Sequence, residues 1–187
     1  NLQYAEQGSF TGTPVIFLHG LSDSWHSFES VMPLLPYNIH AFAISQRGHG
    51  DSDRPLNGYM PKNFAADIAD FIQLHNLQSA WIVGHSMGGA VAQQFATDYP
   101  YLTKGLVFIS FAPSFKANLG MPEFYEQVLK LKDPMDKTFM DEFQKGTLAK
   151  PIASAYYNLL VAEGMKVPVS VFKEALTGLM KTDHTNH

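Results

Sequence analysis

Residues 84–88, with the sequence Gly-His-Ser-Met-Gly, have the residue types and spacing of a nucleophilic site. The apolar run at residues 80–83 predicts a buried strand before them, and Val91 and Phe95 lie on one face of a helix predicted after them. A serine at the apex of a sharp strand-to-helix turn holds a strained backbone conformation that lifts its hydroxyl clear of the sheet. Ser86 is therefore the predicted nucleophile.

The neighbours of Ser86 are expected to form the rest of this turn. Gly84 and Gly88 would leave room for an adjacent segment of the chain, where a Cβ would collide. His85 directly precedes the serine and is expected to point away from it, so we do not assign it the role of the base. A glycine-rich turn without a catalytic role is the alternative interpretation, and the flanking strand and helix favour the catalytic one.

The elements around this turn predict an α/β protein. Strands are expected at residues 2–6, 15–18, 39–44, 80–83 and 105–110, and helices at residues 25–32, at 61–72 and after the serine. Strands that alternate with helices of this length form a parallel, doubly wound sheet. Ser22 or Ser24 is expected to cap the first helix, and Asp51 and Asp53 are expected to build a turn and cap the helix that Pro61 opens.

The composition changes from about residue 113. Prolines at 122, 134, 151 and 168 each precede a helical pattern, a position at which the missing N–H of proline costs nothing. Four consecutive helices without an intervening strand predict a lid over the carboxyl edge of the sheet. We therefore divide the chain into an α/β core at residues 1–112 and a helical lid at 113–187, which includes the start of a link back to the core.

The overall composition argues against several classes of partner. The 187 residues carry a formal net charge of −4 and no basic run, which argues against nucleic acid. The longest apolar runs are far shorter than a membrane span, and no cysteine is present to form a disulfide. We expect a cytoplasmic protein that binds a small molecule and needs neither metal nor cofactor.

Three motifs follow three of the predicted strands in order, and together they resemble the α/β-hydrolase fold superfamily. The motifs are His19-Gly20, Arg47-Gly48-His49-Gly50-Asp51-Ser52 and Gly84-His85-Ser86-Met87-Gly88-Gly89. The similarity is to the branch of esterases, lactonases and C–C hydrolases that carry a helical lid, and it covers essentially the whole chain. It implies part of a doubly wound, mostly parallel sheet with an all-helical lid.

The resemblance also implies roles for individual residues. In that family a histidine takes the proton of the serine, and an acid orients the histidine. The backbone N–H groups of Leu21 and Met87 match the oxyanion hole, and Met87 stands at a predicted helix N-terminus, where the dipole favours negative charge. Trp25 and Phe111 are candidates for the substrate pocket, although most such aromatic residues belong to the core.

No residue of this chain matches the family's acid or its histidine, which follow later strands. His49 is expected in a surface loop, and His19 is expected to shape the turn beneath the oxyanion hole. His184 and His187 lie on a tail that is expected to be untethered. The chain is therefore interpreted as an incomplete form that is truncated before the acid and the histidine.

The sequence thus predicts a serine hydrolase that acts on small hydrophobic esters or lactones through an acyl-enzyme on Ser86. Two alternatives remain open: a C–C or lactone hydrolase on the same scaffold, and a non-catalytic protein that keeps the ligand pocket. The predicted strand at 105–110 would leave an apolar edge exposed, so a complementing C-terminal segment or a second copy of the chain is expected to cover it.

Overall fold

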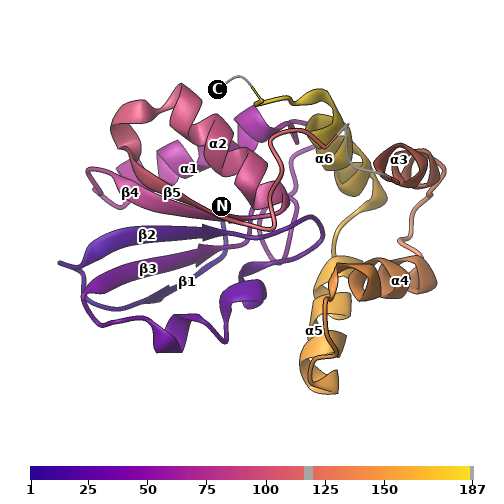
Figure 1. The fold of residues 1–187 in the computed structure, drawn as a ribbon, viewed down its shortest axis with the longest axis horizontal. Helices are drawn as coiled ribbons and strands as arrows, with labels where there is room; N and C mark the ends of the chain where they lie inside the picture. Colours follow the sequence, from indigo (N-terminus) through magenta and orange to yellow (C-terminus); the bar gives the residue numbers. More distant parts are fainter. Residues whose placement is uncertain (116–119, 186–187) are drawn as a thin grey trace.

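The computed structural model describes residues 1–115 and 120–185 (Figure 1). Its strands are β1 (Tyr4–Gln7), β2 (Thr13–Leu18), β3 (Ile39–Ile44), β4 (Ala80–His85) and β5 (Thr103–Ile109). Its α-helices are α1 (Pro61–Leu74), α2 (Met87–Asp98), α3 (Met121–Leu129), α4 (Lys137–Thr147), α5 (Ser154–Met165) and α6 (Val169–Lys181). Three short 3₁₀ segments are η1 (Trp25–Phe28), η2 (Met32–Leu34) and η3 (Pro100–Leu102).

The five strands form one sheet in the order β1-β3-β2-β4-β5 (Figure 1). Strands β2, β3, β4 and β5 are parallel, and β1 pairs with β3 in the antiparallel direction. This arrangement confirms the predicted mostly parallel α/β sheet. In its register Leu18 pairs with Gly84, so the residues that follow β2 and those that follow β4 meet at the same edge.

The two faces of the sheet are covered differently (Figure 1). Helices α1 and α2 pack on one face, whereas the short segments η1 and η2 lie on the other. The predicted single helix at residues 25–32 is therefore wrong. The stretch is closed by i→i+3 hydrogen bonds instead, such as the Val31 N–H to the Phe28 carbonyl at 2.9 Å, which form tighter turns than those of an α-helix. Of the two predicted caps, Ser24 caps η1, since its hydroxyl accepts the His26 N–H at 3.4 Å.

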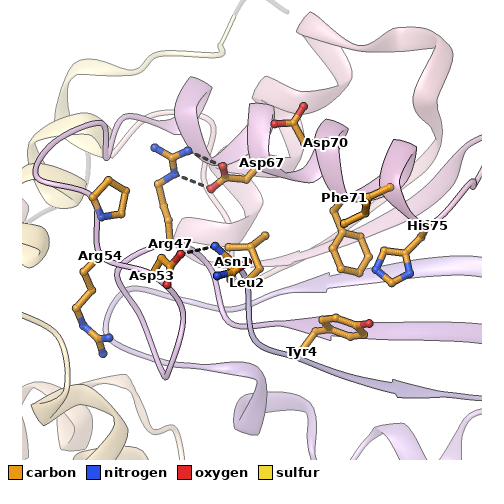
Figure 2. A pocket seen from close by; sticks show the side chains of 12 residues that line it. Asn1, Leu2, Tyr4, Arg47, Asp53, Arg54, Asp67, Asp70, Phe71 and His75 are labelled. Atoms are coloured by element: carbon orange, nitrogen blue, oxygen red, sulfur yellow. Dashed lines mark hydrogen bonds and ion pairs between the residues drawn. The ribbon is translucent and has the colours of Figure 1, made fainter.

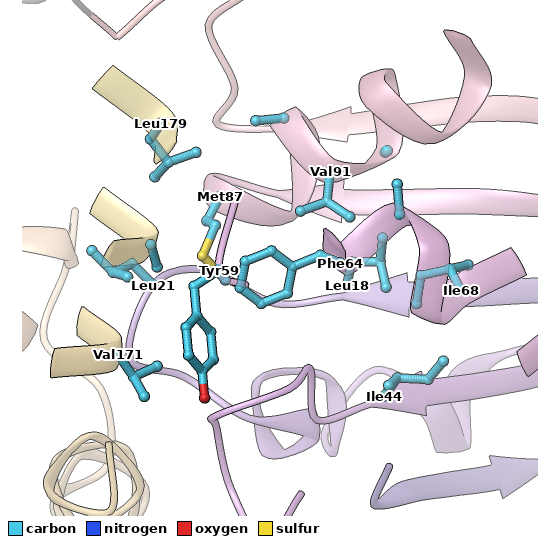
Figure 3. Packing of buried hydrophobic residues seen from close by; sticks show 14 of the residues in the cluster. Leu18, Leu21, Ile44, Tyr59, Phe64, Ile68, Met87, Val91, Val171 and Leu179 are labelled. Atoms are coloured by element: carbon cyan, nitrogen blue, oxygen red, sulfur yellow. The ribbon is translucent and has the colours of Figure 1, made fainter. Parts of the chain in front are cut away.

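Helix α1 begins at Pro61 as predicted, and its apolar stripe lies in the core (Figure 3). Its cap differs from the prediction, because the Met60 N–H donates to the Asn63 side chain at 3.2 Å. Asp51 accepts hydrogen bonds from Gln3 and Lys166. Asp53 pairs with the N-terminal amine. Neither aspartate caps α1, and both make structural contacts elsewhere.

Helices α3 to α6 stand beyond the carboxyl ends of the parallel strands, with no strand between them in the described residues (Figure 1). Val171 and Leu179 of α6 are buried beside Leu21 and Met87, so α6 contacts the same edge of the sheet that carries Ser86 (Figure 3). The division into a core and a lid remains a prediction. Of the helices described, none is long and apolar enough to cross a membrane.

Strand β5 forms one edge of the sheet, and Val107, Phe108 and Ile109 are each 42–43% exposed there. The described part of the C-terminal tail lies near the segment that follows β5. The His184 N–H donates to the Pro113 carbonyl at 2.9 Å, and the Gln93 side chain donates to the His184 carbonyl at 3.3 Å. The expectation of an untethered tail is therefore wrong for His184, while His187 lies outside the described residues.

Candidate functional site

Ser86 occupies the single residue between β4 and α2. Its backbone dihedrals are φ 50° and ψ −114°, a positive-φ conformation that costs a non-glycine residue about 1–3 kcal/mol. The Ser86 N–H donates to the Ile109 carbonyl at 3.0 Å, which fixes the turn to the end of β5. The residue is only half-buried, in contrast to the buried helix start that follows it.

The glycines around Ser86 lie where other chain segments approach most closely. A Cβ on Gly84 would overlap the backbone of Gly88, and a Cβ on Gly88 would overlap the Leu18 carbonyl. The Gly88 N–H donates to the His19 carbonyl at 3.1 Å. We call residues 84–89 the serine turn and residues 19–23 the His-Gly loop. The hydrogen bond between Gly88 and His19 joins the two.

The two amides predicted to hold an oxyanion belong to peptide units with similar surroundings. The Ser86 carbonyl accepts the Gly89 N–H at 2.9 Å, and the Gly20 carbonyl accepts the Asp23 N–H at 3.2 Å. A trans peptide is planar, so its N–H points away from its own carbonyl. The N–H groups of Met87 and Leu21 therefore point out of these two turns. Neither donates a backbone hydrogen bond in the turns and loops of residues 1–115 and 120–185.

His19 is fully buried and holds the His-Gly loop to the segment after β3. Its Nε2 accepts the Gln46 N–H at 2.9 Å, so its proton is on Nδ1, which donates to the Gly20 carbonyl at 2.7 Å. The Gln46 side chain donates to the His19 carbonyl at 2.9 Å. Burial, with the neighbouring His49 ring, holds the pKa of His19 well below its ordinary value. His19 is therefore a neutral structural group.

His49 is buried, so its predicted place in a surface loop is wrong. Its ring lies 5.1 Å from the His19 ring, measured between centroids, and its Nδ1 donates to the Arg47 carbonyl at 2.9 Å. Burial lowers the pKa of His49 to about 4. The glycines and Asp51 of this loop made it appear exposed in the sequence, but its backbone folds the histidine inward against Phe64.

A buried polar cluster at the end of the His-Gly loop was not predicted. Asp23 lies 4.0 Å from His85 Nδ1 and accepts a hydrogen bond from the Gln144 side chain of α4 at 3.2 Å. The same Gln144 nitrogen donates to Ser22 Oγ at 3.2 Å. Burial raises the pKa of Asp23 above its ordinary value, against the effect of the Gln144 hydrogen bond. No sequence pattern links Gln144 to the loop, since 121 residues separate it from Asp23.

The two aromatic residues predicted to line a pocket lie on opposite sides of the sheet. Trp25 packs against the core cluster of the η1 face and stacks on His26 with ring centroids 4.0 Å apart. Phe111 packs on the α2 face and closely covers Gly89 of the serine turn. The geometry thus places Phe111, and not Trp25, directly against the serine turn.

No side chain of residues 1–115 and 120–185 is hydrogen-bonded to the Ser86 hydroxyl. The His85 ring faces Asp23 instead. His184 contacts Pro113 and Gln93, the latter about two helical turns after the serine. Among the same residues, no group of three or more histidines and carboxylates is placed to share a metal ion.

A cavity of about 900 Å³ lies away from these residues, beside the N-terminus (Figure 2). Arg47 and Asp67 form an ion pair at its wall, with Arg47 Nε 2.6 Å from Asp67 Oδ2. This hydrogen bond raises the pKa of Arg47 above its ordinary value. Because each charge is satisfied by the other, the pair offers no free base. It ties the loop that carries Arg47, between β3 and α1, to α1; we call this loop the Arg47 loop.

Comparison with known proteins gives this geometry a context. The sequence model of the α/β-hydrolase fold matches residues 13–154. A 2-(acetamidomethylene)succinate hydrolase of Mesorhizobium japonicum is 38% identical over 112 residues, which are 60% of this chain and 40% of the relative. A soluble epoxide hydrolase of a Corynebacterium species is 31% identical over 112 residues, 60% of this chain and 38% of the relative. The matched part is thus about two fifths of these curated relatives.

Solved structures show the same architecture over nearly the whole chain. A bromoperoxidase of Bacillus anthracis superimposes with a TM-score of 0.84 at 23% identity, covering 98% of this chain and 71% of that one. An esterase of Exiguobacterium antarcticum gives a TM-score of 0.82 at 21% identity, covering 97% and 70%. These identities are low, so the two structures establish the fold alone.

Proposed function

Because the chain belongs to the α/β-hydrolase family, we propose that it carries the nucleophile of a serine hydrolase that cleaves carboxylic esters through an acyl-enzyme on Ser86. The observation that carries the proposal is the strained, half-exposed Ser86 between β4 and α2. A structural serine gains nothing from positive φ at a helix start, whereas a nucleophile gains an accessible hydroxyl.

The reaction uses the groups around this turn in order. The Ser86 oxygen attacks the acyl carbon while its proton passes to a base, and the carbonyl oxygen becomes an oxyanion. The N–H groups of Leu21 and Met87 stabilise that oxyanion, and Met87 adds the positive end of the α2 dipole. The alcohol then leaves with a proton, and water releases the acid from the acyl-enzyme. We assign the base and its acid to the part of the family fold that this chain does not cover.

The substrate class is the least constrained part of the proposal. The apolar side chains of α3 to α6 favour a small or medium hydrophobic acyl group or a lactone. One relative is named for a substrate that is not an ester, 2-(acetamidomethylene)succinate, so a C–C or lactone hydrolase on the same scaffold stays the second candidate. These candidates are separated by measuring which substrates the longest form of the protein turns over: p-nitrophenyl esters, lactones or 2-(acetamidomethylene)succinate.

The experiment is the pre-steady-state release of p-nitrophenol from p-nitrophenyl acetate. In the longest form of the protein we expect a burst approaching one equivalent per chain, lost in Ser86→Ala. Ser110→Ala is the matched control, because Ser110 also has positive φ (48°) at the end of a parallel strand. A burst that survives in Ser86→Ala contradicts the proposal, and saturable ligand binding without any burst would favour a non-catalytic binding protein.

A further inference from the structure

The His-Gly loop is the part of the site whose geometry depends on distant residues. Ser22 is fully buried and has φ 68°, a left-handed conformation that a serine rarely adopts without support. The support comes from α4, because the Gln144 side chain donates to Ser22 Oγ and to Asp23 Oδ1, both at 3.2 Å. Gln144 is itself 2% exposed, so both N–H bonds of its amide are satisfied away from water.

These hydrogen bonds act on the direction of the Leu21 N–H through one peptide unit. The Gly20 carbonyl accepts the Asp23 N–H at 3.2 Å, and the Leu21 N–H is the other end of that same planar peptide. The Gly20 carbonyl has a second donor, His19 Nδ1 at 2.7 Å. If Asp23 moves, only the His19 bond is left, so the peptide can tilt about it and turn the Leu21 N–H. Gln144 therefore reaches Leu21 through Asp23 and Gly20.

A second contact from the helical segment acts beside the first. The Tyr156 hydroxyl of α5 donates to the His26 carbonyl in η1 at 2.9 Å. Helices α4 and α5 are thus both fastened to the stretch that follows β2, one at residues 22–23 and the other at residue 26. The loop and these helices are positioned as one unit.

We propose that Gln144 is a positioning residue that links the docking of α4 to the orientation of the Leu21 N–H. This inference rests on the proposed role of Leu21 as an oxyanion donor. A serine hydrolase of this kind would have its oxyanion hole fully formed only when α4 is seated on the His-Gly loop. Because the side-chain hydrogen bonds of Gln144 go to Ser22 and Asp23, Gln144 acts through the loop on the oxyanion that forms in the transition state.

The first test does not require catalysis. Hydrogen exchange of the Asp23 amide is measured in the wild-type chain, in Gln144→Ala and in the control Glu142→Ala, which truncates an exposed residue of the same helix. We expect exchange at Asp23 to rise about tenfold in Gln144→Ala and to stay unchanged in Glu142→Ala. Unchanged exchange in Gln144→Ala would overturn the inference.

The second test separates positioning from folding. In the p-nitrophenyl acetate burst, amplitude reports the fraction of folded chains, and the saturating rate constant reports acylation. We expect Gln144→Ala to lower that rate constant about tenfold, part of the 10²–10³-fold effect of losing a whole donor, with half-saturation unchanged. A change of amplitude alone would mean a purely structural role and would contradict the inference.

A double variant tests whether the hydrogen bond between Gln144 and Asp23 causes the effect. Gln144→Glu places a carboxylate against Asp23, so it should slow acylation, and Asp23→Asn then supplies an amide that donates in the reverse direction. We expect the pair to recover most of the wild-type rate constant, and failure to recover argues against the hydrogen bond as the cause. If wild type gives no burst while exchange at Asp23 still responds to Gln144→Ala, the proposed function fails but the link between Gln144 and the loop stands.

Discussion

The serine turn and the His-Gly loop meet at the His19 carbonyl, but they are stabilised by different means. The serine turn is made from one continuous stretch, and its shape depends on the absence of side chains at Gly84 and Gly88. The His-Gly loop depends on side chains that are present, above all Gln46 and Gln144, from other parts of the chain. Steric exclusion is insensitive to pH, whereas the polar contacts of the His-Gly loop involve two titratable groups, His19 and Asp23.

The largest expected effect tests the steric half of this comparison. In Gly88→Ala the new Cβ would overlap the Leu18 carbonyl, a backbone atom that cannot move aside. We expect a loss of about 4 kcal/mol in the free energy of unfolding, or failure to fold. Gly146→Ala is the control, since nothing lies within 4 Å of its added Cβ in α4, and it should stabilise by about 0.5–1 kcal/mol. Urea unfolding of both variants measures this, and two equal effects would contradict the steric account.

The next effect concerns pH and the buried histidine beside the loop. His49 has a folded-state pKa of about 4, against an ordinary value near 6.5, so between these values the unfolded chain binds a proton that the folded chain does not. The contribution of His49 to stability is therefore full above about pH 6.5 and is lost as pH falls, by about 3 kcal/mol at pH 4, and buried His19 adds a loss in the same direction. Urea unfolding from pH 7 to pH 4 measures the loss.

The matching variant assigns that loss to one group. His49→Gln should remove the part of the pH dependence that His49 contributes, about 3 kcal/mol between pH 7 and pH 4, and leave the part that buried His19 contributes. Equal slopes in the wild-type chain and in His49→Gln would show that His49 does not contribute to the pH dependence, which would contradict the account.

A smaller effect is expected where the two regions are joined. Gln46→Leu removes the side-chain hydrogen bond to the His19 carbonyl but leaves the one from the Gly88 N–H. We expect a loss of about 1 kcal/mol, the size of one net hydrogen bond. Gln73→Leu, at an exposed position of α1, serves as the control in chemical unfolding. A loss above about 3 kcal/mol would mean that the loop depends on Gln46 far more than on the serine turn.

The smallest effect is expected for an exposed ion pair outside both regions, and it shows how little a surface contact contributes to stability. Asp51→Asn removes a surface ion pair with Lys166, whose nitrogen lies 2.9 Å from the carboxylate. Exposed pairs of this kind contribute about 0–1 kcal/mol, so stability should change by no more than about 0.5 kcal/mol, and less at high salt. A larger change in the melting midpoint, persisting at 1 M salt, would show that the pair fixes the Arg47 loop.

The same contrast explains how much could be predicted from the sequence. Strand β3, the start of α1 at Pro61 and the strand-turn-helix around Ser86 follow from local periodicity and from glycine and proline, and the structure agrees on all three. The helix predicted at residues 25–32 failed because this stretch forms two short 3₁₀ segments, which the spacing of a few apolar residues does not distinguish from an α-helix.

The errors at His49 and Gln144 have a different physical origin. Both are buried by segments distant in sequence, and a polar residue in a polar context carries no periodic signal of burial. Asp23 was visible within the His-Gly motif, but its partner on α4 was not. The elements around Ser86, the proposed nucleophile, were therefore predictable, while the contacts that orient the proposed oxyanion donor were not.

The central claim is that Ser86 is the nucleophile, and covalent labelling tests it most directly. The longest form of the protein is incubated with a fluorophosphonate, its intact mass is measured, and the adduct is located by peptide sequencing. We predict one adduct per chain on Ser86, absent in Ser86→Ala and retained in Ser110→Ala. An adduct on another residue, or none on a folded chain, would contradict the account.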